Sequence, residues 1–332
     1  MSAPVETLVL TASDVARCLP ASECREALAS AFAMLAAGRI AAPRSLTFEA
    51  PEGGFHAKAA LVLGERARFV TKVNGNFPGN PARRGLPTIQ GVVVLADAGD
   101  GRPLAVMDSA SVTAIRTAAT SAVAASRLAR AGAAIAAIVG CGRQGIEHAD
   151  AFLALMPIRE LRLYDLDRSR AERLAARLGE RHGTSCRVAD SVADATLGAD
   201  LIATCTPGAD FVLGEDDVSP GAFVAAVGAD YSRKREIRPS LMARARVVVD
   251  DLDQCAAAGD LHHAIDAGLV GREHVRADLG SVVLETVNVR EHEADIVVFD
   301  STGIALEDVV AADLAYERAR AEGVGLRAAL AS

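Results

Sequence analysis

Two patterns of apolar residues divide the chain into a mixed N-terminal part and a long stretch in which strands and helices alternate. Apolar residues recur at helical spacing over 12–38 and predict a helix there, with Ser13 or Asp14 as its cap. From residue 43 to residue 104, short runs separated by Gly and Pro predict strands over 45–49, 54–63, 68–73 and 88–97. Their composition predicts a loop over 75–81 and a hairpin turn over 97–101. The N-terminal part is therefore β-rich.

An alanine-rich helix over 109–131 leads into the alternating part. There, apolar runs predict strands over 135–139, 161–164, 186–189, 201–206, 223–228, 247–250 and 296–300, and helices over 146–155, 169–178 and 306–321. Such alternation builds a parallel sheet with helices on both faces. The last helix could fold back on the N-terminal part. We therefore predict an α/β protein in which a doubly wound domain, residues 116–304, is inserted in a discontinuous β-rich domain, residues 1–115 plus 305–332.

A glycine-rich turn follows the strand over 135–139 directly. Gly140, Gly142 and Gly145 form G-x-G-x-x-G, a helix comes next, and the following strand ends at Asp165. This order is typical of a Rossmann-type dinucleotide site, in which the pyrophosphate lies at the helix N-terminus and the acid binds the ribose hydroxyls. Because Asp165 would repel a 2′-phosphate, the sequence favours NAD; nearby Arg168 leaves NADP open.

Composition narrows the class of protein. The chain has 332 residues, 51% of them hydrophobic, and a formal net charge of −8 with no basic block, so we expect no nucleic-acid or membrane-surface partner. The first thirty residues lack signal-peptide features, and no apolar run is long enough for a membrane span. Six scattered cysteines without C-x-x-C or zinc spacing are typical of reduced thiols in a cytoplasmic protein and predict no metal site.

With the nucleotide site placed, several other motifs form a recognisable set. The chain resembles the ornithine cyclodeaminase/mu-crystallin family, which also holds archaeal-type alanine dehydrogenases and ketimine reductases. The resemblance covers nearly the whole chain. It rests on Pro43-Arg44, on the segments 72–80, 85–91 and 115–119, on the glycine turn, on Val227-Gly-Ala-Asp230 with Lys234, and on Phe299-Asp-Ser-Thr-Gly303.

The resemblance implies a homodimer with a β-rich substrate and dimerisation domain beside an NAD(P) domain, closing over the nicotinamide, and a small-molecule substrate. It implies Asp230 as the acid/base and Lys72 as the other catalytic candidate. The substrate-binding candidates are Arg44, Lys72, Arg116, Lys58 and Thr302. The cofactor-binding candidates are Thr88, Arg116, Thr117, Gly140, Gly142, Arg143, Gln144, Gly145, Asp165, Thr206, Val227, Gly228, Lys234 and Ser301.

These residue types suit the oxidation of an α-amino acid. The reaction removes a hydride from Cα and a proton from the amine, so a carboxylate near the nitrogen is a natural base. Asp230 follows an apolar strand directly, at the strand end where ligands lie in open α/β sheets. Cations such as Lys72 and Arg116 would hold and orient the substrate carboxylate. Each residue alone also has an ordinary structural explanation, such as a solvated arginine or a capping aspartate.

One departure from the family pattern bears on the substrate. Ornithine-specific cyclodeaminases carry a glutamate on the strand over 54–63, whereas this chain has Lys58 there, with no acid nearby. If Lys58 faces the site, it disfavours a diamine and favours a neutral or acidic side chain. We therefore expect an NAD(H)-dependent amino-acid dehydrogenase or imine reductase acting on a small substrate. An ornithine or lysine cyclodeaminase that uses NAD catalytically, and a cofactor-bound binding protein, are the alternatives.

Overall fold

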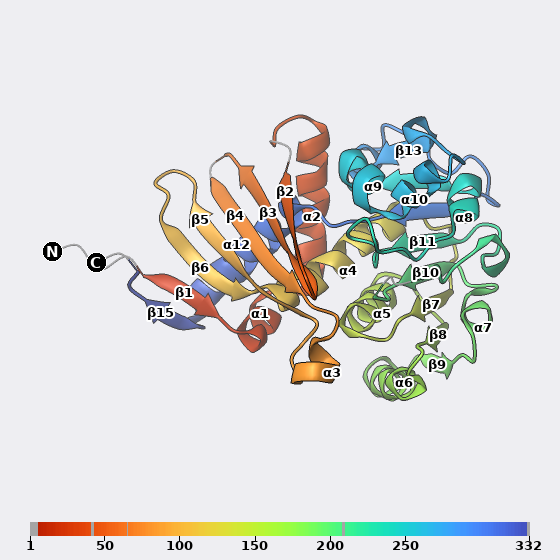
Figure 1. Cartoon of the computed structure of the whole chain (residues 1–332), viewed down its shortest axis with the longest axis horizontal. Coiled ribbons are helices and arrows are strands. Elements are labelled where there is room, and N and C mark those ends of the chain that lie inside the picture. The colour runs from red at the N-terminus through yellow and green to blue at the C-terminus, as the bar shows by residue number, and fades with distance from the viewer. Residues whose placement is uncertain (1–5, 41–42, 65, 208–209, 331–332) are drawn as a thin grey trace. The chain divides into compact units, whose positions relative to one another are not determined.

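The chain forms two compact units in the computed structural model, which describes residues 6–40, 43–64, 66–207 and 210–330 (Figure 1). The first unit comprises Met1–Arg116 with Ile304–Ser332, and the second comprises Thr117–Gly303. The predicted domain boundaries differ from these at Arg116 and Ile304, which both lie with the first unit.

The first unit is built on one twisted sheet. Within the described residues it has seven strands in the order β15-β1-β6-β5-β4-β3-β2, antiparallel except for the β1–β6 pair. The strands are β1 (Thr7–Leu10), β2 (Arg44–Ala50), β3 (Gly53–Val62), β4 (Arg68–Asn76), β5 (Ile89–Asp97), β6 (Pro103–Asp108) and β15 (Leu326–Ala328). The helices are α1 (Ala12–Cys18), α2 (Ala21–Ala36), α3 (Asn80–Arg84) and α12 (Ala305–Glu322), and α4 (Ser109–Leu128) crosses into the second unit.

The single helix predicted over 12–38 is wrong, because the chain breaks it at Leu19 and Pro20. Leu19 has φ −119° and ψ 81°, outside the helical region, as a residue before proline prefers. The predicted caps are also wrong: Thr11 caps α1 in a capping box with Asp14. The loop predicted over 75–81 is shorter than expected, since β4 extends to Asn76 and α3 begins at Asn80.

Helix α12 packs on the sheet of its own unit, against β3, β4 and β5 (Figure 1). The prediction that the last helix folds back on the N-terminal part is confirmed. Arg68 of β4 fastens it through Asp313, with the Nε and Oδ1 atoms 2.6 Å apart, and through Glu317. The end of the chain thereby completes the N-terminal unit.

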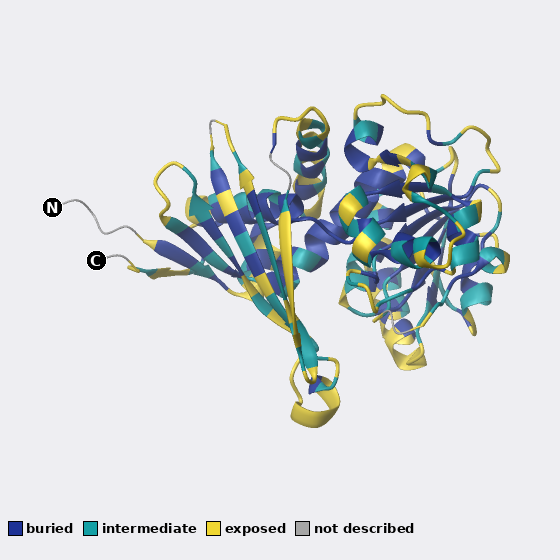
Figure 2. Ribbon diagram, turned by 45° about the horizontal axis from the view of Figure 1, so that its top comes forward, coloured by how far each residue is buried: buried dark blue, intermediate teal, exposed yellow. Residues whose placement is uncertain are grey.

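The opposite face of that sheet is apolar and exposed. Strand alternation and the cross-strand pairs place seven large side chains on it, each more than a third exposed. They are Leu46, Phe48, Phe55, Leu61, Phe69, Val73 and Val92, and we call them the outer apolar face. Figure 2 shows exposed stretches along these strands. Contiguous apolar surface of this kind marks an interaction site in soluble proteins.

The second unit contains the predicted parallel sheet. Its described residues form eight parallel strands in the order β13-β12-β14-β11-β10-β7-β8-β9. They are β7 (Ile135–Val139), β8 (Glu160–Tyr164), β9 (Ser185–Val188), β10 (Leu201–Thr204), β11 (Phe223–Ala226), β12 (Arg246–Val249), β13 (Val275–Asp278) and β14 (Val297–Asp300). The helices are α5 (Arg143–Leu155), α6 (Arg168–His182), α7 (Val192–Thr196), α8 (Pro239–Arg244), α9 (Leu252–Ala258), α10 (Asp260–Asp266) and α11 (Leu279–Val283), with 3₁₀ turns Glu215–Asp217 and Arg272–His274. The Rossmann-type fold is confirmed.

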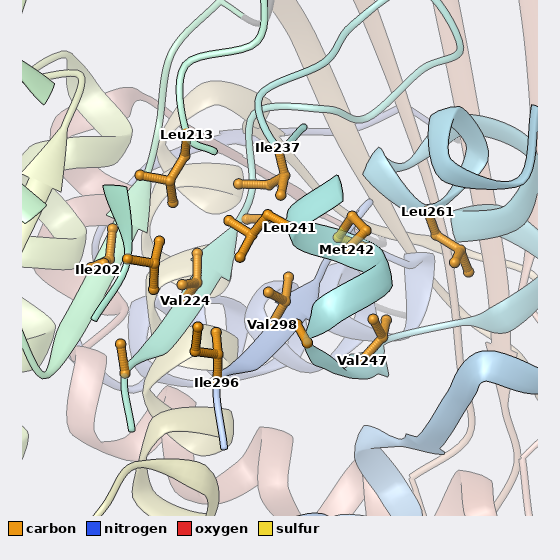
Figure 3. Packing of buried hydrophobic residues seen from close by; sticks show 14 of the residues in the cluster. Ile202, Leu213, Val224, Ile237, Leu241, Met242, Val247, Leu261, Ile296 and Val298 are labelled. Atoms are coloured by element: carbon orange, nitrogen blue, oxygen red, sulfur yellow. The ribbon is translucent and has the colours of Figure 1, made fainter. Parts of the chain in front are cut away.

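The core of this unit explains why its strands read as nearly continuous apolar runs. Val224 of β11 and Val298 of β14 are fully buried, and Figure 3 shows them beside Leu241 and Met242 of α8. A parallel sheet is covered on both faces, so both sides of each strand must be apolar. Among the described residues, no helix is both long enough and apolar enough to cross a membrane.

Candidate active site

The glycine turn lies where the strand order of the second unit changes direction. Strand β7 has β10 on one side and β8 on the other, and ligands of doubly wound sheets bind outside the carboxyl ends of strands at such a point. Gly140 has φ +96°, and a Cβ there would lie 2.7 Å from the Cys205 carbonyl oxygen. A Cβ on Gly145 would lie 2.0 Å from the Gly140 oxygen. Both positions therefore require glycine.

Gly142 differs, because a Cβ there would meet open space. Helix α5 begins at Arg143, three residues before the predicted start, and its N-cap Gly142 makes no side-chain capping bond. Gly142 thus provides no side chain to cap the first turn of α5, and the space beside it is open, which suits a pyrophosphate. The carboxylate of Asp165 accepts hydrogen bonds from the N–H groups of Cys141 and Asp167, both at 2.8 Å, so it is held in place beside the turn. The residues present fit a dinucleotide.

Arg168 is held by two acids. Its Nε atom lies 3.1 Å from Glu172 and its Nη1 atom 2.6 Å from Asp190. The cation that left NADP open is therefore already paired with carboxylates, which weakens its attraction for a 2′-phosphate.

Asp230 and Lys234 form an ion pair after β11. Asp230 Oδ1 lies 2.7 Å from Lys234 Nζ, and the side chain of Asp230 is 43% exposed against 16% for Lys234. Burial disfavours the charge on Lys234, but Asp230 raises the pKa of the lysine above its usual value. Asp230 is thus an accessible carboxylate that is held in place by its ion pair with the more buried Lys234. Lys234, predicted as a cofactor residue, contacts the candidate base.

The motif over 299–303 is organised by Asp250, which sequence reasoning missed. Asp250, at the end of β12, accepts hydrogen bonds from the Ser301 hydroxyl at 3.0 Å, the Thr302 hydroxyl at 3.3 Å and the Gly303 N–H at 2.6 Å. Ser301 and Thr302 are both buried. Their hydroxyl groups therefore fix this loop to the neighbouring strand.

A buried cluster of opposite charges lies in the first unit between the sheet, α4 and α12. Lys72 of β4 donates to Asp308 at 2.8 Å, and Arg116 donates to Asp308 at 3.2 Å and to Glu307 at 2.7 Å. The pKa of Lys72 is lowered to about 8, chiefly by burial and also by the charges of Arg116 and Lys58, whereas Asp308 acts in the opposite direction. Although burial acts against ionisation, Lys72 and Arg116 hold the pKa of Asp308 below its usual range. The structure therefore brings Lys72 and Arg116 together.

Sequence reasoning missed Glu307 and Asp308. The available signal was two adjacent acids in the otherwise apolar stretch Ala305-Leu-Glu-Asp-Val-Val310, where buried charges require partners.

Lys58 joins this cluster, whereas Arg44 does not. Lys58 of β3 is paired with Lys72 across the sheet, so both side chains share a face. Arg44 is paired with Ala59, the residue next to Lys58 in β3, and it is exposed at the start of edge strand β2. Strand alternation places Arg44 on the sheet face opposite to Lys72. The predicted grouping of Arg44 with Lys72 is therefore not seen.

The other predicted cofactor residues fall in both units. Thr88 lies in the first unit just before β5, and the rest lie in the second. Thr117 is buried in α4, Arg143 is exposed at the start of α5, and the buried Oε1 atom of Gln144 has no hydrogen-bond partner. Thr206 and Val227 follow β10 and β11, and Gly228 comes next. Thr206, Val227 and Gly228 therefore lie at the carboxyl edge of the sheet, where the glycine turn also lies.

Comparison with known proteins identifies the relatives of this chain. The alanine dehydrogenase of Archaeoglobus fulgidus is 33% identical over 321 residues, which cover 97% of this chain and 98% of the relative. An archaeal alanine dehydrogenase dimer with bound NAD superposes with a TM-score of 0.92 at 32% identity, over 98% of this chain and 99% of the other. The Δ1-pyrroline-2-carboxylate reductase of Thermococcus litoralis, in complex with NADH and L-proline, gives 0.92 at 28% identity, over 96% and 99%. The model of the ornithine cyclodeaminase/mu-crystallin family matches residues 5–323, and the chain belongs to this family.

Proposed function

We propose that this protein is an NAD-dependent oxidoreductase that interconverts a small α-amino acid and its α-imino acid. The observation that carries the proposal is the accessible Asp230 carboxylate, held by Lys234, at the carboxyl edge of the sheet that bears the glycine turn. In the oxidative direction, Asp230 would accept a proton from the substrate amine, and a bound NAD would supply the acceptor for the hydride of Cα. The products are the imino acid, NADH and a proton.

The substrate carboxylate is assigned to Lys72 and Arg116. These two cations are buried and fixed by Asp308 and Glu307, so they are preorganised to orient a bound anion. The role of Arg44 in substrate binding stays a prediction from the family resemblance.

NAD is the proposed cofactor. The paired state of Arg168 and the fixed carboxylate of Asp165 favour it over NADP, and two structural relatives contain NAD or NADH. When bound, the nicotinamide supplies the hydride acceptor or donor.

Lys58 supports a substrate whose side chain is neutral or acidic. It lies on the same sheet face as Lys72, and its charge lowers the pKa of that lysine, so it acts on the proposed carboxylate site. A diamine would bring a further positive charge toward a cluster whose three cations, Lys58, Lys72 and Arg116, outnumber its two acids, Glu307 and Asp308, which is unfavourable. This argument ranks an amino-acid dehydrogenase or imine reductase above an ornithine cyclodeaminase.

The proposal is tested by following NADH absorbance with NAD and a panel of L-amino acids, and with NADH and keto or cyclic imino acids plus ammonia. Stoichiometric NADH formation or consumption is expected. Asp230→Asn should lower kcat by roughly 100-fold or more, the contribution of a general base, while NADH still binds. The control Asp210→Asn changes an exposed acid of the same unit and should keep full activity.

Two results would overturn the proposal. Ammonia release from ornithine without net change in NADH would make the protein a cyclodeaminase. Bound NADH without turnover of any substrate would make it a binding protein.

We also propose that the protein is a homodimer formed through the outer apolar face. The face is too apolar to be left in water without cost, and the archaeal alanine dehydrogenase relative is a dimer.

A further inference from the structure

Glu236 is a buried carboxylate to which the sequence patterns assigned no role. It is fully buried, and its Oε1 atom accepts a hydrogen bond from the Thr206 N–H at 2.6 Å. Its Oε2 atom accepts another from the Gly228 N–H at 2.8 Å. Thr206 and Gly228 each lie two residues beyond the end of a strand, β10 and β11, which are neighbours in the sheet. One side chain therefore joins two loops at the sheet edge where the glycine turn and Asp230 lie.

The glycine at position 228 is explained by this carboxylate. A Cβ on Gly228 would lie 2.3 Å from Cδ of Glu236 and 2.5 Å from both of its oxygens, and these are its three nearest heavy atoms. Gly228 was predicted as a cofactor-binding residue. Its missing side chain makes room for Glu236 to reach the backbone, and its contact with the cofactor stays a prediction.

Glu236 is itself fixed by two further buried carboxylates. Oδ1 of Asp260 accepts hydrogen bonds from the N–H groups of Glu236 at 2.7 Å and Ile237 at 2.9 Å. Asp300, the last residue of β14, accepts from the N–H groups of Asp260 at 3.3 Å and Leu261 at 2.8 Å. This series connects the end of β14 to the ends of β10 and β11. Burying a carboxylate costs free energy, and here each buried carboxylate binds backbone N–H groups. The series therefore indicates that the backbone positions of the loops after β10 and β11 must be held closely.

The loop 228–236 is closed twice. The first residue of the loop, Gly228, donates its N–H to the side chain of the last residue, Glu236. Within the loop, Lys234 and Asp230 form an ion pair, with Nζ and Oδ1 2.7 Å apart. The orientation of the Asp230 carboxylate therefore depends on where Glu236 holds the backbone. We propose that Glu236 is a positioning residue, which fixes the loop bearing Asp230 and the Thr206 backbone for hydride and proton transfer. This inference rests on the proposed role of Asp230 as the acid/base.

The chain provides a matched control at the other edge of the same sheet. Oδ2 of Asp200 accepts hydrogen bonds from the N–H groups of Ala134 at 2.7 Å and Ile135 at 2.9 Å, next to the start of β7. Asp200 is thus a second buried carboxylate that joins two backbone N–H groups, at the strand ends remote from the glycine turn.

The first experiment compares Glu236→Gln with Asp200→Asn in the full chain. In Glu236→Gln the amide keeps one acceptor oxygen and turns its NH₂ group toward the N–H that the other oxygen bound. In Asp200→Asn the remaining oxygen can keep both backbone N–H groups, and the NH₂ group then faces the Arg130 guanidinium, so both variants should lower Tm. Only Glu236→Gln should speed amide hydrogen exchange in the segment 227–234, because local opening governs that exchange. Only Glu236→Gln should lower kcat, by roughly 10- to 100-fold, the effect of a small misplacement of a catalytic group, with KM nearly unchanged. Equal effects of both variants on exchange and kcat would overturn the inference.

The second experiment uses Gly228→Ala, Glu236→Ala and the double variant. If the carboxylate occupies the space beside Gly228, Gly228→Ala alone should lower Tm strongly. The double variant should then lose less Tm than the two single losses added together, since truncating Glu236 makes room for the new methyl group. Additive losses would mean that Gly228 serves another purpose and would overturn the inference.

The readouts separate this inference from the proposed function. Hydrogen exchange and Tm need no substrate, so they test the positioning of the loop even if no substrate is turned over, in which case the proposed function fails alone. If turnover is found but Glu236→Gln behaves as Asp200→Asn does, the inference fails alone.

Discussion

At the scale of single residues, the structure distinguishes side chains that the sequence grouped by type. Lys58, Lys72 and Arg44 are all cations on neighbouring strands, yet pairing places Lys58 and Lys72 on the face covered by α12 and Arg44 on the other. One step in register decides which face a residue occupies. Lys72 is buried with Asp308 as a partner, and there burial changes the chemistry of the amine.

The pKa of Lys72 predicts a pH limit for substrate binding. Because burial lowers this pKa to about 8, the amine loses its charge at a lower pH than an ordinary lysine does. For an anionic substrate, kcat/KM should therefore fall as pH rises through about 8. In Lys72→Arg the cation stays charged, so this decline should move to higher pH. Removing the neighbouring charge in Lys58→Met should also move it upward.

The measurement is the pH profile of kcat/KM for the same substrate with each enzyme, so that ionisation of the substrate itself cancels. Identical profiles for the wild type and Lys72→Arg would show that Lys72 does not set the limit.

At the scale of secondary-structure elements, α12 connects the end of the chain to the candidate carboxylate site. It supplies Glu307 and Asp308 to the buried charge cluster at its first turn and Asp313 to Arg68 further along. The helix was predicted from its apolar pattern, and its return to the first unit is confirmed. Its role in fixing the cations was not predictable, because helical periodicity does not identify the partners of an acid.

Removing the charge of Asp308 should destabilise the protein strongly. Asp308→Asn removes the carboxylate that both Lys72 and Arg116 contact, and breaking one partner of a buried ion pair costs about 3–5 kcal/mol. Asp313→Asn, on the same helix, is the matched control. Its carboxylate is 23% exposed and only one of several partners of Arg68, so about 1 kcal/mol or less should be lost.

The free energy of unfolding in denaturant measures both effects. Similar losses in the two variants would show that the Asp308 cluster is no more than an ordinary ion pair.

At the scale of the whole molecule, the outer apolar face predicts an oligomer. Phe69 is 39% exposed on this face, opposite Leu61 on the neighbouring strand. Phe69→Glu would place a charge in a subunit interface, so the protein should become monomeric. Leu269→Glu changes an apolar residue of the second unit that is 53% exposed, and it should leave the dimer intact. Light scattering after size exclusion gives the mass; a wild-type monomer, or a Phe69→Glu dimer, would contradict the proposal.

The sequence by itself determined the features that depend on local pattern. The apolar runs and the glycine turn predicted the parallel sheet and the dinucleotide site, because strand, turn and helix follow one another along the chain and each carries its own signal. The family motifs pointed to Lys72, Arg116 and Asp230 before any contact was known. Short strands such as β1, β13 and β15 were missed, since so few residues carry no clear periodicity.

The tertiary structure decided which groups meet. Lys72 and Asp308 are 236 positions apart, and their ion pair exists only because α12 returns to the sheet. Glu236 reaches Thr206 and Gly228 only because β10 and β11 are neighbours, and Arg44 is separated from Lys72 only by strand register. The physical reason is the same in each case. A charged or hydrogen-bonding side chain gains its role from the partner it reaches and from the water it loses, and both are set by non-local packing.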